Sequence, residues 1–320
     1  MPAEQPGPVV CFSYLAAAEL WSVPGFPQAN QGAEVFAIEQ SIAADGPMVA
    51  AVLSALGVPS LLLANHGGDD ARGAQVQEWL QRYRVATTTA VETDVTTPWI
   101  VVVADNARTR TWFPHLPGVI DALTHVDLSP FAGASFAYID GYQLIEAPAL
   151  RAIQAARAAD IPLLLNLGGS PLTAGAAEAV RGHSGLIVQT NVDDDHLAEA
   201  DRIAPVILED TEAAWVVITA GASGVLALSR SEQLIFPAFR AEVRHTHCAG
   251  AAFSGALIYG LQRGWSLTDS LTLANASGAM RCERNHGEPF PALHELHVFM
   301  TSRERAPQSL FAPSAACPHP

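Results

Sequence analysis

The sequence contains no lysine, and all 17 of its positively charged residues are arginines. A Schiff-base lysine and the lysine of a phosphate-binding P-loop are therefore excluded. The 32 acidic residues outnumber the arginines, so the formal net charge is −15 and the pI is near 5.0. The arginines are scattered along the chain, so we expect no nucleic-acid partner.

Cysteine and long apolar runs are scarce as well. Cysteine occurs four times, without C-x-x-C spacing, at Cys11, Cys248, Cys282 and Cys317. No apolar run reaches the length that spans a membrane, and the first residues, MPAEQPGPVV, lack a basic start followed by an apolar stretch. We therefore predict a reduced, soluble, cytoplasmic protein with no membrane partner.

Hydrophobic residues make up 49% of the 320 residues, which is enough for one large core. Short apolar runs alternate with helical patterns, and this order favours parallel strands joined by crossover helices. The predicted strands are 8–14, 60–65, 136–140, 161–167, 185–190, 214–219 and 224–228; the predicted helices are 47–56, 72–82, 148–159, 173–181, 194–200, 208–213, 250–262 and 267–284. The pattern predicts an α/β fold, a three-layer α/β/α sandwich with a mostly parallel central sheet.

One region departs from this alternation. Residues 86–116 alternate apolar and polar side chains around the turn DNAR, which predicts an antiparallel hairpin. Together with residues 15–40 it is expected to form a small β lid. We predict a single domain over residues 1–302, followed by a Pro- and Ala-rich tail over residues 303–320.

Two stretches near the C-terminus carry a family resemblance. VVITAGASGVLAL (216–228) and RHTHCAGAAFSGALIYGL (244–261) resemble the motifs T-x-G-x-x-G-V and D-T-x-G-A-G-D-x-F-x-G of the ribokinase-like, phosphofructokinase-B type sugar and nucleoside kinases. The matching residues are Thr219, Gly221, Gly224 and Val225 in the first, and Thr246, Ala249, Gly250, Phe253 and Gly255 in the second. Weaker matches at 53–85, 138–144 and 189–197 keep the family's order, so the resemblance spans roughly residues 8 to 300.

The resemblance implies a ribokinase-type fold whose ligands lie at the carboxyl ends of the parallel strands, under the lid. It implies a small-molecule ligand, namely a nucleoside, nucleotide or sugar phosphate, ATP or ADP with Mg as cofactor, and a homodimer formed through the lid. The expected nucleotide-binding residues are Asn191, Asp194, Thr219, Gly221 and Gly224, and the expected substrate-binding residues are Glu19, Asp45, Arg110 and Asn166. An arginine on a hairpin such as Arg110 is also commonly a solvated edge residue.

The sequence departs from the family at the residues that perform the chemistry. Ala251 stands where the family has the aspartate that takes the proton of the sugar hydroxyl, and His245 replaces the first aspartate of the same motif. Ala18 stands at the position of the aspartate that holds sugar hydroxyls, with Glu19 one step out of register. The family's G-G-x-x-x-N segment becomes AADGPM (43–48). Loss of a general base alone costs on the order of 10²–10⁴ in rate.

The small residues at the start of the helix predicted at 250–262 are expected to form an anion hole, because helix N-termini present unsatisfied N–H groups to negative charge. These residues are Cys248, Ala249, Gly250 and Ala251. A site that has lost its catalytic aspartate can therefore still bind phosphate. The alternative is that the small side chains only allow this helix to pack closely against the sheet.

His245, His247 and Cys248 are candidate replacements for the missing base, since both side-chain types can titrate near neutral pH. The alternative for these side chains is polar filling of a widened pocket, and no spaced partner pair predicts a metal site. Two hypotheses of function follow. The protein is a diverged kinase homologue with weak phosphotransfer or a repurposed reaction in a specialised pathway, or it is a non-catalytic pseudokinase that binds a ligand or regulates a partner.

Overall fold

The computed structural model describes residues 6–107, 109–193 and 197–305. An eight-stranded sheet in the order β14-β13-β12-β11-β10-β9-β1-β4 crosses the molecule. The strands are β1 (Val9–Phe12), β4 (Ser60–Leu63), β9 (Phe136–Asp140), β10 (Leu163–Asn166), β11 (Leu186–Asn191), β12 (Trp215–Thr219), β13 (Val225–Leu228) and β14 (Gln233–Phe236). All pairs from β4 to β12 are parallel, whereas β13 and β14 are antiparallel to their neighbours.

Local sequence explains both kinds of pairing. The parallel strands are buried on both faces, so they appear as continuous apolar runs such as VVCF in β1. Between β12 and β13 the chain has only a short turn, which is too short for a parallel crossover. Gly224 closes that turn with φ 104°, and a Cβ there would lie 2.1 Å from the Phe236 carbonyl oxygen.

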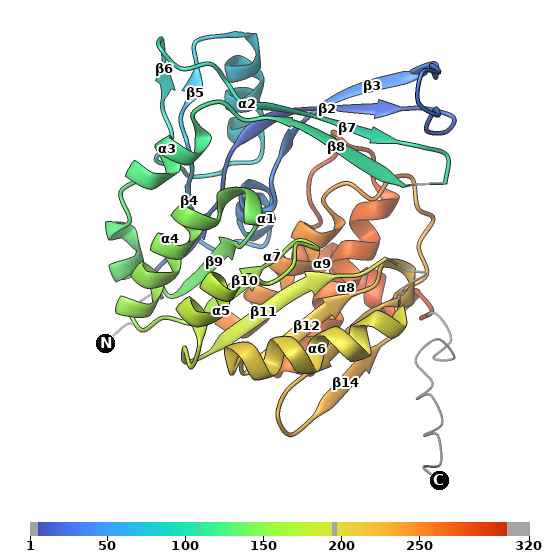
Figure 1. Ribbon diagram of the computed structural model, residues 1–320. Helices are drawn as coiled ribbons and strands as arrows, with labels where there is room; N and C mark the ends of the chain where they lie inside the picture. The colour runs from blue at the N-terminus through green and yellow to red at the C-terminus, as the bar shows by residue number, and fades with distance from the viewer. Residues whose placement is uncertain (1–5, 108, 194–196, 306–320) are drawn as a thin grey trace.

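Helices cover both faces of the sheet, so the predicted three layers are present (Figure 1). One apolar core packs α1 (Asp45–Ala55), α7 (Ala249–Gln262) and α8 (Leu267–Glu283) against the sheet face that includes Val9 and Cys11. A second core lies on the opposite face with α3 (Val119–His125), α4 (Glu146–Ala158), α5 (Ala174–Val180) and α6 (Leu197–Thr211). The remaining helices are α2 (Ala71–Arg82) and α9 (Leu293–Ser302), and a short sheet joins β5 (Gly67–Gly68) to β6 (Val91–Glu92).

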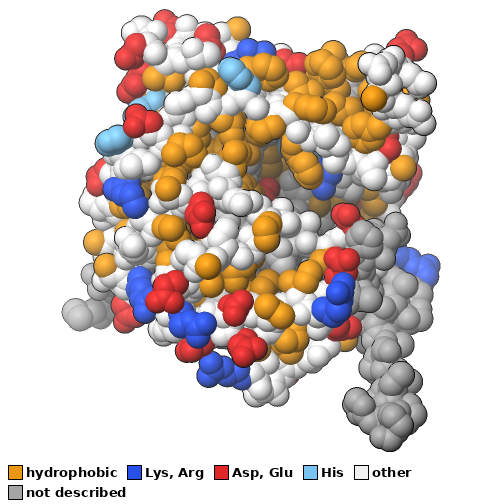
Figure 2. All heavy atoms as spheres, viewed as in Figure 1, with side chains coloured by type: hydrophobic (Ala, Val, Ile, Leu, Met, Phe, Trp, Pro, Cys, Tyr) orange, Lys and Arg blue, Asp and Glu red, His pale blue; other side chains and the backbone are white. Residues whose placement is uncertain are grey.

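The predicted lid is a separate four-stranded sheet in the order β3-β2-β7-β8. It consists of β2 (Ala16–Ser22), β3 (Ala37–Ala43), β7 (Trp99–Ala104) and β8 (Arg110–His115), and β7 and β8 form the antiparallel hairpin. Figure 1 shows this sheet projecting over the molecule at the top of the view, and Figure 2 shows the surface hollowed beneath it. The lid runs directly into α1, because β3 ends two residues before that helix begins.

The structure corrects one part of the sequence prediction. The described parts of the patterns at 194–200 and 208–213 belong to one helix, α6, which continues through Pro205, and residues 194–196 lie outside the described residues. Pro205 is exposed, so the carbonyl that lacks its helical N–H partner can be solvated by water. The helices α3 and α9 and the strand β14 were not predicted.

The tail is described only at its start, where residue 305 forms an antiparallel bridge with Phe239. Residues 306–320 lie outside the described residues. The division into a domain over residues 1–302 and a tail stays a prediction. Within the described part of the chain, no helix combines the length and apolar character needed to span a membrane.

Candidate functional site

Polar side chains gather at the carboxyl edge of the parallel strands. Ser13 directly follows β1, Asp140 ends β9 and Asn166 ends β10, while Asp45 begins α1. Carboxyl ends of parallel strands share one edge of the sheet, so residues far apart in sequence meet there. This is the edge where the family resemblance places a ligand.

Asn166 stands between two carboxylates. Its Nδ2 lies 3.0 Å from Asp45 Oδ2 and 3.3 Å from Asp140 Oδ1. The Tyr142 hydroxyl donates to Asp45 Oδ2 at 2.7 Å, and the Tyr138 hydroxyl donates to Asp140 Oδ1 at 2.8 Å. We call these five residues the acid cluster. Asp45 and Asn166, both predicted to bind substrate, lie together in this cluster, and their role in binding stays a prediction.

The two acids of the cluster differ in their surroundings. Asp140 is fully buried, and burial together with the charge of Asp45 raises the pKa of Asp140 to about 7, against hydrogen bonds from Ser13, the Gly46 N–H and Tyr138 that favour its ionised form. Asp45 is only partly buried. Asp140 is therefore the buried carboxylate of the cluster, and Asp45 is the carboxylate that a ligand can reach.

The backbone that leads into Asp45 is strained. Ala44 has φ 79° and ψ 155°, a region that only glycine normally occupies and that costs other residues on the order of 1–3 kcal/mol. The family resemblance expects paired glycines at this place. Ala44 keeps the backbone conformation of a glycine. The direction in which the Asp45 side chain projects from the start of α1 is therefore retained, at a cost in stability.

An anion hole is predicted at the N-terminus of α7, where the Ala249 N–H is already bonded to the Thr246 carbonyl at 3.3 Å. Cys248 is its N-cap in the left-handed conformation, with φ 65° and ψ 9°. The first helical hydrogen bond runs from the Ala252 N–H to the Cys248 carbonyl, so the N–H groups of Gly250 and Ala251 precede any intrahelical acceptor. Gly250 is exposed, whereas the Ala251 side chain is fully buried in the core.

The helices α1 and α7 lie side by side. Gly255 of α7 faces Val52 of α1 so closely that a Cβ on Gly255 would lie 2.6 Å from Val52 Cγ1. Asp45 also acts electrostatically on Cys248 at the start of α7. The two helix N-termini are therefore neighbours at the same edge of the sheet.

Three histidines pack beside the start of α7. The rings of His245 and His286 stack with centroids 3.8 Å apart, and His247 lies 5.6 Å from His286. Burial is the main cause that lowers the pKa of His245 to about 4 and that of His286 to about 3. Burial also lowers the pKa of His247 well below its ordinary value. All three rings are therefore neutral at pH 7.

Arg281 of α8 is a buried cation in this region, with 2% of its surface exposed. Its guanidinium donates to the backbone carbonyls of Asn285, His286 and Glu288. It also interacts with the Cys248 thiol, and its Nε–H has no hydrogen-bond partner among the described residues. A fixed positive charge thus lies next to the N-cap of α7.

The lid is connected to the segment before α7 by polar contacts. Ser41 Oγ of β3 lies 3.0 Å from His247 Nε2, and Arg110 Nη1 of β8 donates to the Thr246 carbonyl at 3.3 Å. Arg110 therefore reaches the predicted site. Glu19 of β2 instead contacts Arg72 of α2 at 3.7 Å, so the structure does not place it in the acid cluster.

The predicted nucleotide-binding residues lie at the ends of β11 and β12. Asn191 is exposed at the end of β11, and Thr219 ends the adjacent β12. Gly221 and Gly224 form the turn after β12. Asp194 lies outside the described residues. The four described positions are next to one another at the carboxyl edge, and the role of all five residues stays a prediction.

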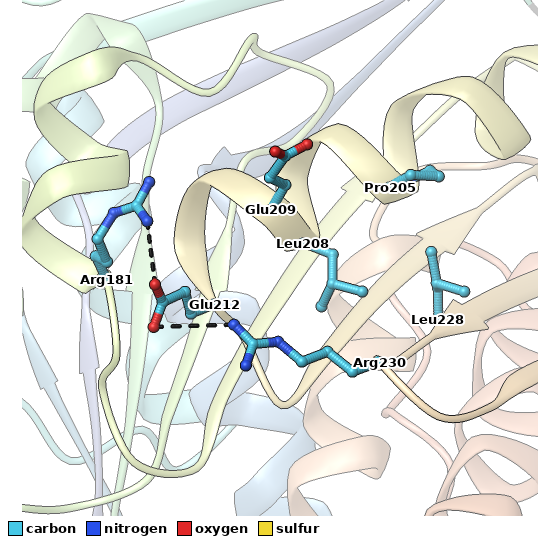
Figure 3. Close-up of a pocket in the computed structure, with 7 residues that line it drawn as sticks. All are labelled: Arg181, Pro205, Leu208, Glu209, Glu212, Leu228 and Arg230. Carbon is cyan, nitrogen blue, oxygen red and sulfur yellow. Dashed lines mark hydrogen bonds and ion pairs between the residues drawn. The ribbon is translucent and has the colours of Figure 1, made fainter.

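A surface pocket of 470 Å³ lies at the opposite edge of the sheet, between α6 and β13 (Figure 3). Arg181 and Arg230 both face the single carboxylate of Glu212 there, at 3.1 Å and 3.9 Å. A second cavity of 300 Å³ lies at the base of the lid and is lined by Asn65, His66 and Glu92 among others. In the described part of the chain, no group of three or more His, Cys, Asp or Glu side chains is arranged to hold a metal ion.

Comparison with known proteins identifies the architecture. The model of the pfkB family of carbohydrate kinases matches residues 10–291. The chain belongs to this family. Its fold is accordingly the ribokinase type, and its members are phosphotransferases that act on sugars and nucleosides.

Individual relatives agree with this family. An aminoimidazole riboside kinase of Salmonella typhimurium is 28% identical over 75% of this chain and 82% of its own length. A microbiome-derived acarbose kinase is 18% identical, with a TM-score of 0.74 over 93% of this chain and 100% of that chain. Arabidopsis thaliana ribokinase, solved with ribose and ATP, is 16% identical, with a TM-score of 0.70 over 92% of this chain and 99% of that chain.

Several residues of the site escaped the sequence analysis. Asp140 could have been predicted from the sequence, because it is a carboxylate at the end of an otherwise apolar predicted strand. Tyr138 lies in the same strand and Tyr142 closely follows it. Arg281 and His286 could not have been predicted. In the sequence, an arginine inside a predicted helix and a histidine in a loop look like ordinary surface residues.

Proposed function

We propose that this protein is a diverged ribokinase-like enzyme that binds a nucleoside or sugar in the acid cluster and ATP or ADP with Mg beside α7, and that transfers phosphate slowly. Burial of Asp140 and Asn166 next to the more accessible Asp45 suits a ligand that presents several hydroxyl groups. The riboside kinase among the relatives and the ribokinase solved with ribose and ATP support this class of ligand.

One observation carries the proposal. The N–H of Gly250, an exposed residue at the start of α7, and the acid cluster at the start of α1 lie on neighbouring helix termini under one lid. An N–H group at a helix N-terminus attracts a phosphoryl group, and carboxylates hold hydroxyl groups. Both halves of a phosphotransfer site are present, although the first turn of α7 contains no acid.

A second candidate is a non-catalytic binding protein, a pseudokinase. It is favoured by the complete burial of the Ala251 side chain, which belongs to the core and not to a cleft. The contact between Ser41 and His247 points the same way, because it occupies the histidine nitrogen that faces the lid. Measured phosphate transfer separates the two candidates.

The test combines binding and turnover. Calorimetry measures the affinity for Mg-ATP, and γ-labelled ATP measures transfer to a panel of sugars and nucleosides. Gly250→Pro removes one exposed N–H at a position where a Cβ meets nothing within 4 Å, and proline is tolerated in a first helical turn. We expect about 10- to 100-fold weaker nucleotide binding, because a hydrogen bond to a charged group contributes about 1.5–3 kcal/mol.

The matched control is Thr268→Pro, which makes the same change at the equivalent position of α8. It should leave nucleotide affinity unchanged. Equal affinities for wild type and Gly250→Pro would show that α7 does not hold the nucleotide. Slow transfer by wild type supports the enzyme, and tight binding without transfer supports the pseudokinase.

We also propose that the protein forms a homodimer through the lid. Large apolar side chains are exposed on or beside its strands, at Phe26 (41%), Phe36 (60%), Ile38 (60%), Trp112 (57%) and Phe113 (56%). Figure 2 shows hydrophobic side chains gathered at the upper right of the view, over the lid. Exposed large apolar side chains gathered on one element favour an interface.

A further inference from the structure

We propose that Asp45, at the start of α1, is the carboxylate that accepts the proton of the substrate hydroxyl in place of the acid missing at Ala251. This inference rests on the proposed phosphotransfer function and adds a catalytic residue to it. The acid would have moved from the first turn of one helix to the first turn of its neighbour.

The alignment of the two helices supports this position. Gly255 of α7 lies against Val52 and the Val49 carbonyl of α1. Ala251 is one helical turn before Gly255, and Asp45 is one turn before Val49. Because the two N-termini are neighbours, moving back one turn along each helix from this contact places Asp45 beside Ala251.

Asp45 is held in place while part of it stays accessible. Tyr142 and Asn166 both donate to its Oδ2, so Oδ1 is the oxygen left to face a ligand. Burial and nearby carboxylates raise the pKa of Tyr142 well above its ordinary value, which keeps the phenol a donor. A carboxylate fixed by its rear oxygen is pre-organised to meet a hydroxyl.

An independent feature marks where the phosphoryl group would lie. Arg281 is 2% exposed, lies close enough to the Cys248 thiol at the N-cap of α7 to lower the pKa of that thiol, and has a buried Nε–H without a partner among the described residues. None of the ion pairs found in the described residues involves it. A buried cation that lacks a counter-ion favours an anionic ligand beside it.

The reaction then balances as follows. The substrate hydroxyl oxygen forms a bond to the γ-phosphorus of the nucleoside triphosphate, and its proton passes to Asp45 Oδ1. The bond from γ-phosphorus to the bridging oxygen breaks, and its electron pair stays on the nucleoside diphosphate. The α7 N–H groups and Arg281 face the negative charge of the transferred group.

The simpler role for Asp45 is structural, since an acid in a first turn stabilises the helix dipole. Asp121 provides the matched comparison, because it is the first-turn acid of α3 and is highly exposed. We therefore compare Asp45→Asn with Asp121→Asn. Thermal melts report any structural effect, and Asp45→Ser provides a second variant if the amide disturbs folding.

The readout is phosphate transfer from γ-labelled ATP to the acceptor panel. We expect Asp45→Asn and Asp45→Ser to lower kcat by about 10²–10⁴-fold, with a smaller change in KM for the acceptor. Asp121→Asn should match wild type. A purely structural role would lower the melting temperature of both first-turn variants and leave kcat of the folded enzyme intact.

Turnover by folded Asp45→Asn that equals wild type would overturn the inference while the proposed function stands. A wild-type protein that binds Mg-ATP in the calorimeter and transfers nothing to any acceptor would overturn the proposed phosphate transfer as well, and would leave the pseudokinase. Absence of nucleotide binding by wild type would instead overturn the proposed function itself, and the role of Asp45 with it.

Discussion

The contact between α1 and α7 can be tested by one added methyl group. A Cβ at Gly255 would lie 2.6 Å from Val52 Cγ1 and 2.7 Å from Val52 Cβ, far inside ordinary van der Waals contact. Forcing extra volume into a packed core costs about 1–3 kcal/mol. Alanine gains about 1 kcal/mol over glycine in a helix interior. Gly255→Ala should therefore lose up to about 2 kcal/mol of the free energy of unfolding.

The same substitution on the same helix provides the control. A Cβ at Gly250 meets nothing within 4 Å, so Gly250→Ala should be neutral or stabilising by up to about 1 kcal/mol. Urea unfolding followed by circular dichroism measures both variants. If Gly255→Ala is as stable as Gly250→Ala, the two helices do not pack as closely as the structure has them, and the alignment of Asp45 with Ala251 loses its support.

Three further predictions concern strain, charge and assembly. Ala44→Gly should stabilise the protein by about 1 kcal/mol in thermal unfolding, because its backbone is in a glycine region; a loss of stability would contradict the strain. Burial, His245 and Arg281 lower the pKa of His286 to about 3. Below about pH 6.5 the unfolded chain therefore binds more protons than the folded protein, so the free energy of unfolding falls as the pH drops from about 6.5 toward 3. His286→Gln should flatten this fall by up to about 1 kcal/mol per pH unit after solvent screening; unchanged slopes would refute it. Trp112→Ser combined with Phe113→Ser should turn a dimer into a monomer in light scattering, and unchanged mass would remove the lid from the interface.

The sequence predicts the layers and the lid well because both depend on local patterns. Continuous apolar runs such as 161–167 and 214–219 predict buried strands, and β10 and β12 lie inside them. The Thr- and Val-rich alternation over 86–116 predicts a hairpin that β7 and β8 confirm. Period and turn residues are read within a few neighbours along the chain, so they need no tertiary information.

The acid cluster depends on strand order, which no local pattern provides. Asp45 and Asn166 are 121 residues apart, and they meet because β10 lies in the sheet near β1 and α1. Asp140 belongs to the same group only because β9 lies between β1 and β10. The stacking of His245 on His286 likewise joins two loops that the sequence does not relate.

The electrostatics around Cys248 narrow the choice of proton acceptor. Burial raises the pKa of its thiol to about 12, although Arg281 opposes this shift and Asp45 adds to it. The thiol therefore stays protonated at neutral pH and cannot accept a proton. His247 is neutral but holds its Nε2 toward Ser41 of the lid. Of Cys248, His247 and Asp45, the carboxylate of Asp45 is thus the best-placed acceptor, because its Oδ2 is fixed by Tyr142 and Asn166 while its Oδ1 accepts from neither.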